Sequence, residues 1–128
     1  LRHTVGISDW SDDDFAAAVA EAHAAPADCL GRLFGLRAGP LLFGDAAPSG
    51  SARLSGLLIG AEIATGMAAG DEPLCLVATG SVAERYAAAL TALGIDFDRA
   101  DAEDAVRNGL FAMAARIWPE RELLETDA

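Results

Sequence analysis

The sequence predicts a helix-rich α/β fold with a small parallel sheet. The apolar run Leu74 to Ala78 is followed by Thr79-Gly80 and then by Ser81-Val82-Ala83-Glu84. This order indicates a buried strand, a tight glycine turn and the start of a helix. A second short strand over Ile95 to Asp98, followed by a helix after Asp101, repeats the arrangement. Strands joined by a helix in this way run parallel with a right-handed crossover.

Composition limits the classes of function. The chain has 128 residues, which suits one domain with its own core. Its nine basic residues are all Arg, and a net charge of −11 disfavours binding to nucleic acid or to an anionic membrane. Cys29 and Cys75 lie among apolar residues without C-x-x-C spacing, so we expect two buried free thiols. We recognise no secretory signal or membrane-spanning run and expect a cytoplasmic protein.

Residues 1–50 predict a helical lead-in and a loop. Ser11 is a typical N-cap followed by three acidic residues, and Trp10 and Phe15 have the spacing of a hydrophobic staple. The first helix should therefore run from Asp12 to Ala25 and end at Pro26.

A second helix is expected over Asp28 to Arg37, and Gly39-Pro40 should end it. Leu41-Leu42-Phe43 should then begin a loop, through residues 44–50, whose apolar end points inward. The side chains expected on the inner side of this helix are Cys29, Leu30, Leu33 and Phe34.

The longest helix is predicted from Ala52 to Ala69. Gly56, Gly60 and Ala64 recur at every fourth position and leave a flat side that another backbone can approach closely. Arg53 and Glu62 favour a helix packed within a water-soluble domain over a membrane helix pair. The residues expected to face the core are Leu54, Leu57, Leu58 and Ala61.

The strand, turn and helix around Gly80 form the main candidate site. The unbroken run Leu74 to Ala78 suits a strand covered on both faces, and Ser81 and Glu84 have capping-box spacing. Free N–H groups at the helix start and the missing Cβ of Gly80 suit an anion or nucleotide, although many such turns hold no ligand. The inner face of this helix should carry Val82, Tyr86, Ala89, Leu90 and Leu93, with Gly94 as the stop.

Residues 51–118 thus predict an α-β-α-β-α unit, followed by an acidic tail over 119–128. Asp101 should cap the last helix, which ends at Trp118-Pro119. Two strands make too small a sheet to stand alone, so its remainder should come from a parent protein or from a second copy. One stripe of the last helix holds Val106, Gly109, Leu110, Met113 and Ile117.

No catalytic or metal-binding residue is assigned from the sequence. His3 and His23 have no partner at catalytic spacing, and the acidic run at residues 12–14 fits a helix cap better than a cation site. Walker-type, G-x-G-x-x-G and G-x-S-x-G motifs are not present. Two interpretations stay open for Glu62 and Arg85, either ordinary surface ion pairs or side chains that reach the Gly80 turn.

Several blocks of the sequence resemble the 2-dehydro-3-deoxygalactonokinase family. They span roughly Arg32 to Ala115, and Leu-Ser-Gly-Leu-Leu-Ile-Gly-Ala-Glu at residues 54–62 is the most specific. The other blocks are Arg32-Leu33-Phe34, Leu36-Arg37-Ala38-Gly39, Ala83-Glu84-Arg85-Tyr86 and Asn108-Gly109-Leu110. The family is a bacterial sugar-acid kinase that uses ATP with Mg²⁺ to phosphorylate 2-dehydro-3-deoxygalactonate. It is similar to the sugar kinase, actin and Hsp70 superfamily, in which two ribonuclease-H-like domains close over ATP.

The resemblance implies that residues 1–128 are an incomplete ribonuclease-H-like, actin-like ATPase C-terminal lobe. Thr79, Gly80 and Ser81 fall where the superfamily places its adenosine-contacting glycine motif. Gly56, Gly60 and Glu62 on the preceding helix are weaker cofactor-binding candidates.

The Asp-x-Gly-x-Thr phosphate motif of the N-terminal lobe and a catalytic base are missing from this sequence. We therefore expect an inactive fragment whose partners are that lobe and, in the full enzyme, the sugar acid. The alternative is a non-catalytic interaction or dimerisation domain that forms a homo-oligomer. A weaker third hypothesis is a free-standing protein that binds a nucleotide or another anion.

Overall fold

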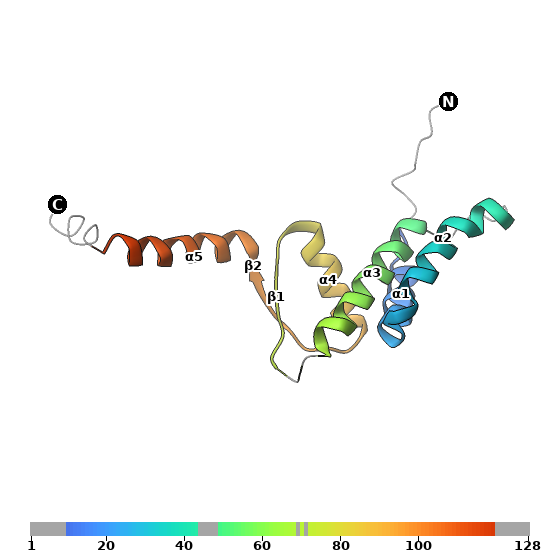
Figure 1. Cartoon of the computed structure of the whole chain (residues 1–128), viewed down its shortest axis with the longest axis horizontal. Helices are drawn as coiled ribbons and strands as arrows, with labels where there is room; N and C mark the ends of the chain where they lie inside the picture. The colour runs from blue at the N-terminus through green and yellow to red at the C-terminus, as the bar shows by residue number, and fades with distance from the viewer. Residues whose placement is uncertain (1–9, 44–48, 69, 71, 120–128) are drawn as a thin grey trace, which may run out of the picture.

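The structure is a computed structural model that describes residues 10–43, 49–68, 70 and 72–119. Helices α1 to α4 pack into one body, and α5 extends away from it beyond the two strands (Figure 1). The elements in chain order are α1 (Asp12–Ala24), the 3₁₀ helix η1 (Pro26–Asp28), α2 (Cys29–Phe43), α3 (Gly50–Met67), β1 (Cys75–Ala78), α4 (Gly80–Ala92), β2 (Asp98–Asp101) and α5 (Ala102–Ile117). A helix-rich α/β fold is thus confirmed.

The two strands pair in parallel, as predicted. Cys75 lies opposite Asp98 and Ala78 lies opposite Asp101. The second strand was placed too early in the sequence, because β2 begins at Asp98 rather than at Ile95. Ile95 and Phe97 instead pack against the core on the way to β2. Gly94 ends α4 as expected, with φ of +69° and its N–H donated to the Thr91 carbonyl oxygen at 3.0 Å.

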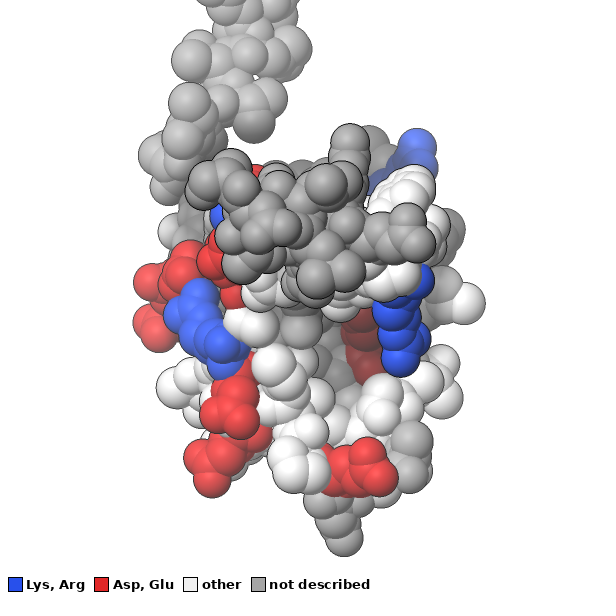
Figure 2. Space-filling view, turned by 90° about the vertical axis from the view of Figure 1, so that its left-hand side faces the viewer, with Lys and Arg blue, Asp and Glu red and all other residues white. Residues whose placement is uncertain are grey.

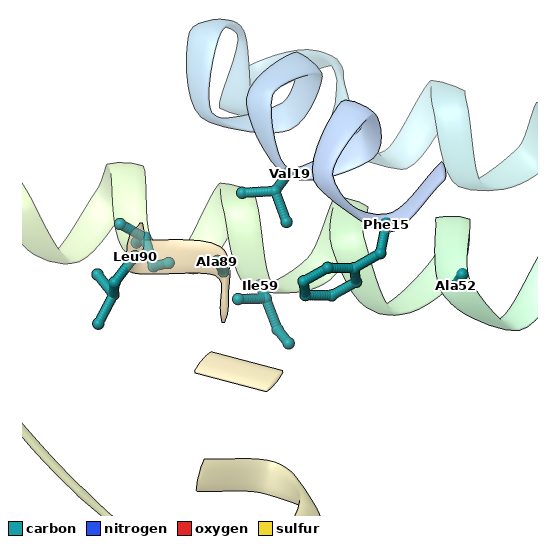
Figure 3. Packing of buried hydrophobic residues seen from close by; sticks show 7 residues of the cluster. Phe15, Val19, Ala52, Ile59, Ala89 and Leu90 are labelled. Carbon is teal, nitrogen blue, oxygen red and sulfur yellow. The ribbon is translucent and has the colours of Figure 1, made fainter. Parts of the chain in front are cut away.

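The core forms where α1 lies across the glycine face of α3. Phe15 and Val19 of α1 point toward Ile59 of α3, and Ala89 and Leu90 of α4 complete the cluster (Figure 3). A Cβ atom on Gly56 would lie 2.6 Å from the Phe15 carbonyl oxygen. A Cβ atom on Gly60 would lie even closer to the carbonyl oxygen of Val19. The flat side predicted for this helix is confirmed, and the backbone that approaches it is that of α1.

The leucine face of α3 was assigned wrongly in part. Leu57 is fully buried, but Leu54 and Leu58 are 46% and 49% exposed. The buried side of α3 is the one on which Gly56 and Gly60 meet α1, and Leu54 and Leu58 lie outside it.

The expected end of the second helix is also wrong. Helix α2 continues through Pro40 to Phe43. A proline inside a helix removes one backbone hydrogen bond, and this one lies at an exposed end of α2, where water can satisfy the carbonyl that loses its partner. Leu41 and Leu42 are exposed rather than inward, and the loop expected after them lies mostly at residues 44–48, outside the described residues.

The inner side of α2 is partly as expected. Cys29 is buried, with its thiol donating to the Leu57 carbonyl oxygen at 3.5 Å, and Leu33 packs against the same small cluster. Leu30 and Phe34 were expected inside and are 80% and 72% exposed. These two side chains thus lie on the side of α2 that the described residues leave uncovered.

The sheet is covered on one face, which contradicts the prediction of a fully buried strand. Leu76 and Ala78 are half-buried, whereas Cys75 and Val77 are exposed, so one of the two expected buried thiols is accessible. Val82 of α4 is also exposed rather than inward. The predicted stripe of α5 is exposed along its length, because beyond its first turn this helix has no described partner. No described helix combines the length and the apolar character needed to cross a bilayer.

Replacing Gly56 by alanine should destabilise the protein. The added methyl group would meet the Phe15 carbonyl oxygen and the Ala18 side chain, so α1 would have to move away from α3. We expect a loss of about 1–3 kcal/mol in the free energy of unfolding, measured by chemical denaturation.

Gly66→Ala is the matched control in the same helix. A Cβ atom there meets nothing within 4 Å, and alanine favours a helix over glycine by up to about 1 kcal/mol. This variant should be as stable as the parent or more so. Equal stability of the two variants would show that the α1–α3 contact is not as close as described.

Candidate functional site

The carboxyl ends of both strands meet at one edge of the sheet. Ala78, the last residue of β1, lies opposite Asp101, the last residue of β2. Helix α4 begins directly after β1 and α5 directly after β2, so the N-termini of two helices lie at this edge. Helix N-termini carry unpaired N–H groups and a partial positive charge. The edge is therefore the part of the described chain best suited to hold a polar ligand.

The turn between β1 and α4 is open. Gly80 has φ of +67°, a conformation that side chains with a Cβ rarely adopt, and nothing lies within 4 Å of the place where a Cβ would stand. Thr79 and Ser81 are exposed on either side of it. A ligand could thus approach the backbone of the turn directly.

The helix start differs from the capping box that the sequence indicated. The N-cap of α4 is Thr79 rather than Ser81, and its side chain makes no capping bond to the helix. Glu84 does not reach back to the turn but pairs with Arg99 of β2 at 2.7 Å. Arg99 lies on β2, which pairs with β1 ahead of α4, so Glu84 has a cationic partner that local sequence does not reveal.

Asp101 joins the two turns. The Thr79 hydroxyl donates to Asp101 Oδ2 at 2.7 Å, and the N–H groups of Glu103 and Asp104 donate to Asp101 Oδ1 at 2.9 and 3.1 Å. The hydrogen bond from Thr79, followed by that from the Asp104 N–H, lowers the pKa of this carboxyl. Asp101 was predicted as the cap of α5, which is confirmed, but its bond to Thr79 could not be found without the register of the strands.

The weaker candidates lie elsewhere. Gly56 and Gly60 are buried beneath α1, which gives them a packing role and leaves no space beside them. Arg85 stacks over the Trp10 ring, 4.6 Å from its centroid, and so ties α4 to the start of α1. The described residues show no ion pair for Arg85, and its contact with the Gly80 turn stays a prediction.

Glu62 meets α4 rather than the Gly80 turn. Its carboxylate accepts a short hydrogen bond from the Tyr86 hydroxyl, which raises the pKa of Tyr86 to about 12. Both side chains line a mostly apolar groove of about 310 Å³ between α3, β1 and α4. Because Thr79, Gly80 and Ser81 do not line this groove, the structure does not bring the six predicted cofactor-binding residues together.

Arginines near the carboxyl edge are engaged by acidic side chains. Arg107 pairs with Asp104 at 3.2 Å, in addition to the pair between Arg99 and Glu84. Seen from the α5 side, acidic and basic side chains lie among uncharged ones (Figure 2). Because these carboxylates balance their charge, Arg99 and Arg107 are poorly suited to bind a phosphate group.

Comparisons with known proteins agree on one family. The family model described as 2-keto-3-deoxy-galactonokinase matches residues 1–113. A protein of Rhizobium meliloti (strain 1021), described as a probable 2-dehydro-3-deoxygalactonokinase, is 43% identical over 124 residues, which are 93% of this chain and 40% of that protein. A crystal structure of a Sinorhizobium meliloti protein with the same enzyme description is 40% identical, with a TM-score of 0.74 over 92% of this chain and 41% of that one. The chain thus spans about two fifths of the length of the relatives it matches.

Tyr86 is the only tyrosine of the chain, so its ionisation can be followed by tyrosinate absorbance. We expect a midpoint at about 12 in the folded protein and a shift toward the ordinary value of about 10 in Glu62→Gln. Because the pKa of Tyr86 is raised in the folded state, its hydrogen bond to Glu62 stabilises the fold fully below about pH 10. This contribution to the free energy of unfolding is lost as the pH rises through about 12.

Glu84→Gln serves as the control for this titration. Like Glu62, Glu84 carries a carboxylate, but it lies on α4 and pairs with Arg99 rather than with Tyr86. The titration midpoint of Tyr86 should therefore not move in this variant. An equal shift in both variants would mean that general negative charge, and not the bond to Glu62, holds the proton on Tyr86.

Thr79→Val should weaken the acid dependence of stability. In the parent, the lowered pKa of Asp101 gives stabilisation that is present above the unfolded pKa of about 3.9 and is lost as the pH falls through the folded value. Valine keeps the branched shape but removes the hydroxyl, so the pKa of Asp101 should rise. Unfolding measured at about pH 6 and about pH 3 should differ less in this variant than in the parent.

Ser81→Ala, which removes the neighbouring exposed hydroxyl, should leave that difference unchanged. If Ser81→Ala changed the acid dependence as much as Thr79→Val, the link between Thr79 and Asp101 would not be its source.

Proposed function

This chain belongs to the 2-keto-3-deoxy-galactonokinase family, and we propose that it is the C-terminal, nucleotide-side lobe of an ATP-dependent sugar-acid kinase. The substrate proposed for the whole enzyme is 2-dehydro-3-deoxygalactonate. The observation that carries the proposal is the match to a kinase relative over 93% of this chain at 43% identity. The Gly80 turn, at a sheet edge where two helices begin, supplies a place for the nucleotide.

The proposal assigns the chemistry to the part of the enzyme outside this chain. Phosphoryl transfer requires several groups that position the phosphates and neutralise their charge together. The described residues offer an open turn, the Asp101 carboxylate and neutralised arginines, which suit binding rather than transfer. In the whole enzyme Mg²⁺ would accompany ATP, and the N-terminal lobe would bring the phosphate-binding residues and the sugar acid.

The turn favours the adenosine end of ATP over its phosphates. Asp101 lies at the same edge as Gly80, and its carboxyl, whose pKa is lowered by the hydrogen bond from Thr79, is ionised at neutral pH. A carboxylate repels phosphate but accepts hydrogen bonds from the hydroxyl and amino groups of a nucleoside. We therefore assign Thr79, Gly80 and Ser81 to contacts with adenosine. Gly56 and Gly60 then support the fold, while Glu62 and Tyr86 belong to a separate groove.

The alternative of a dimerisation domain rested on two observations, the small-residue face of α3 and the incomplete sheet. The first no longer supports it, because α1 occupies that face of α3. The incomplete sheet and the exposed stripe of α5 still require a partner, and the remainder of the kinase meets that requirement as well as a second copy does.

The proposal is tested with a chimera in which this chain replaces the matching segment of the Rhizobium meliloti relative. The chain alone should not phosphorylate 2-dehydro-3-deoxygalactonate, whereas the chimera should do so with ATP and Mg²⁺. Phosphorylation by the 128-residue protein on its own would contradict this division of roles.

Gly80→Ala should raise the KM of the chimera for ATP by about tenfold or more, because a Cβ would keep the nucleotide from the backbone of the turn. The same substitution should cost about 1–2 kcal/mol of stability, since φ is positive there. Steady-state kinetics at varied ATP measures the first effect and chemical denaturation the second.

Gly94→Ala is the matched control, because Gly94 has φ of +69° at the opposite end of the same helix. It should cost similar stability and leave the KM for ATP unchanged. If both variants raised KM equally, the effect would reflect strain alone and the turn would not be the nucleotide site.

A further inference from the structure

Thr79 and Asp101 together offer a ligand only hydrogen-bond acceptors. A threonine hydroxyl has one hydrogen and two lone pairs, and an ionised carboxylate has lone pairs only. Thr79 gives its one hydrogen to Asp101 Oδ2 at 2.7 Å, and Asp101 Oδ1 accepts two backbone N–H groups of α5. Neither side chain has a hydrogen left to donate, so the lone pairs of both are what a ligand meets.

The polarity of the Thr79 hydroxyl is fixed by the structure. A free hydroxyl rotates to donate or to accept as its neighbour requires. The hydroxyl of Thr79 is committed, because its bond to Asp101 is charge-assisted and its length of 2.7 Å is typical of a bond from a hydroxyl to a carboxylate. Asp101 is held in turn at its other oxygen by the start of the helix that it caps. Turning the Thr79 hydrogen toward a ligand would break this bond, so the oxygen remains an acceptor.

This acceptor lies at the open turn. Thr79, Gly80 and Asp101 are all exposed, and nothing lies within 4 Å of the place where a Cβ of Gly80 would stand. The strand register sets Ala78 opposite Asp101, which brings the end of β2 beside the turn that follows β1. A ligand that reaches the backbone of the turn therefore meets the Thr79 oxygen next to it.

Purine bases differ in polarity at one position. Adenine carries an amino group, which donates, where guanine and hypoxanthine carry a carbonyl oxygen, which accepts. A fixed acceptor bonds the amino group, whereas it leaves the carbonyl oxygen unpaired and facing another lone pair. Ribose hydroxyls both donate and accept, so they gain nothing particular from an acceptor of fixed polarity.

We propose that Thr79 and Asp101 select the base of the nucleotide, with the Thr79 oxygen accepting a hydrogen bond from the amino group of adenine. Asp101 is a positioning residue, because it holds the hydrogen of Thr79 and so keeps that oxygen an acceptor. The inference rests on the proposed function, since it takes the Gly80 turn as the place of the nucleoside. It adds the reason why a purine with an amino group is preferred to one with a carbonyl oxygen.

Asp101→Asn reverses the polarity and keeps the cap of α5. Asparagine caps helices as well as aspartate does, and its amide oxygen accepts the N–H groups at the helix start. The NH₂ group of the amide then faces Thr79 and donates to its oxygen, which turns the hydrogen of Thr79 outward. This variant thus offers a ligand a donor where the parent offers an acceptor.

Binding of adenosine and of inosine to the 128-residue chain measures the preference, by ligand-detected NMR titration. Inosine has the ribose of adenosine and a carbonyl oxygen in place of the amino group. The parent should bind adenosine about tenfold more tightly than inosine, and Asp101→Asn should lower this ratio to about one or less. An unchanged ratio in Asp101→Asn would overturn the proposal.

Glu103→Gln is the matched control. It removes the same negative charge two residues further along the chain and keeps the backbone N–H that Asp101 accepts. The ratio of adenosine to inosine affinity should stay at the parent value. An equal fall in both variants would assign the preference to general charge and not to the polarity of Thr79.

Thr79→Val examines the contact with the base. Valine keeps the branched shape and removes the oxygen, so the preference for adenosine should fall about as far as in Asp101→Asn. A parent ratio retained in Thr79→Val would show that Thr79 does not touch the base. If 2′-deoxyadenosine or 3′-deoxyadenosine bound more weakly while inosine bound as well as adenosine, the acceptor would serve the ribose, and base selection would be refuted.

The chimera described above separates this inference from the proposed function. Its kcat/KM for ATP relative to inosine triphosphate should fall about tenfold in Asp101→Asn, mainly through KM. Kinase activity at an unchanged ratio would overturn base selection and leave the kinase assignment in place. An inactive chimera, with a chain that still prefers adenosine through Asp101, would refute the proposed function and support the selection. An inactive chimera and a chain that binds neither nucleoside would overturn both.

Discussion

The contact between α1 and the glycine face of α3 is the constraint on which the rest of this structure depends. Gly56 and Gly60 let the backbone of α1 come so close that a Cβ atom at either position would clash with it. That approach fixes the rotation of α3 and turns Ile59 and Ile63 toward the cluster that holds α4. Since α4 follows β1 directly, the position of the strand and of its turn follows from a helix contact made far from them. The absence of a Cβ at Gly56 and at Gly60 thus helps to determine where the candidate site lies.

The candidate site is built from few residues, and each belongs to a turn. Gly80 provides a positive φ and open space, while Asp101 ties its own turn to Thr79 across the strand pair. The arrangement puts two helix starts and one carboxylate at the same edge, which suits a neutral nucleoside better than phosphate. The groove beside β1 that holds Glu62 and Tyr86 is a different surface, which the Gly80 turn does not line.

Sequence patterns predicted local structure well and burial less well. The cap at Ser11, the stop at Gly94 and the cap at Asp101 are confirmed, because each depends on hydrogen bonds between residues two or three positions apart. Apolar periodicity misplaced Leu54, Leu58, Leu30 and Phe34, since it identifies the apolar stripe of a helix and not which part of that stripe other elements cover. The exposed stripe of α5 has the same cause. The capping box at Ser81 did not form, because Glu84 found Arg99 on a strand that the local pattern could not place beside it.

By itself the sequence determined the class of fold, the order of the elements, the parallel strands and the family, because these follow from local hydrogen bonding, chain connectivity and blocks of residue identity. It also predicted the Gly80 turn as a ligand site, and the structure shows that this turn is open. Only the tertiary structure decided which face of α3 is buried, that Gly56 and Gly60 serve packing, that Glu62 binds Tyr86 and that Thr79 meets Asp101. Those outcomes depend on distances between residues far apart in the chain, which packing and strand register set and local sequence does not encode.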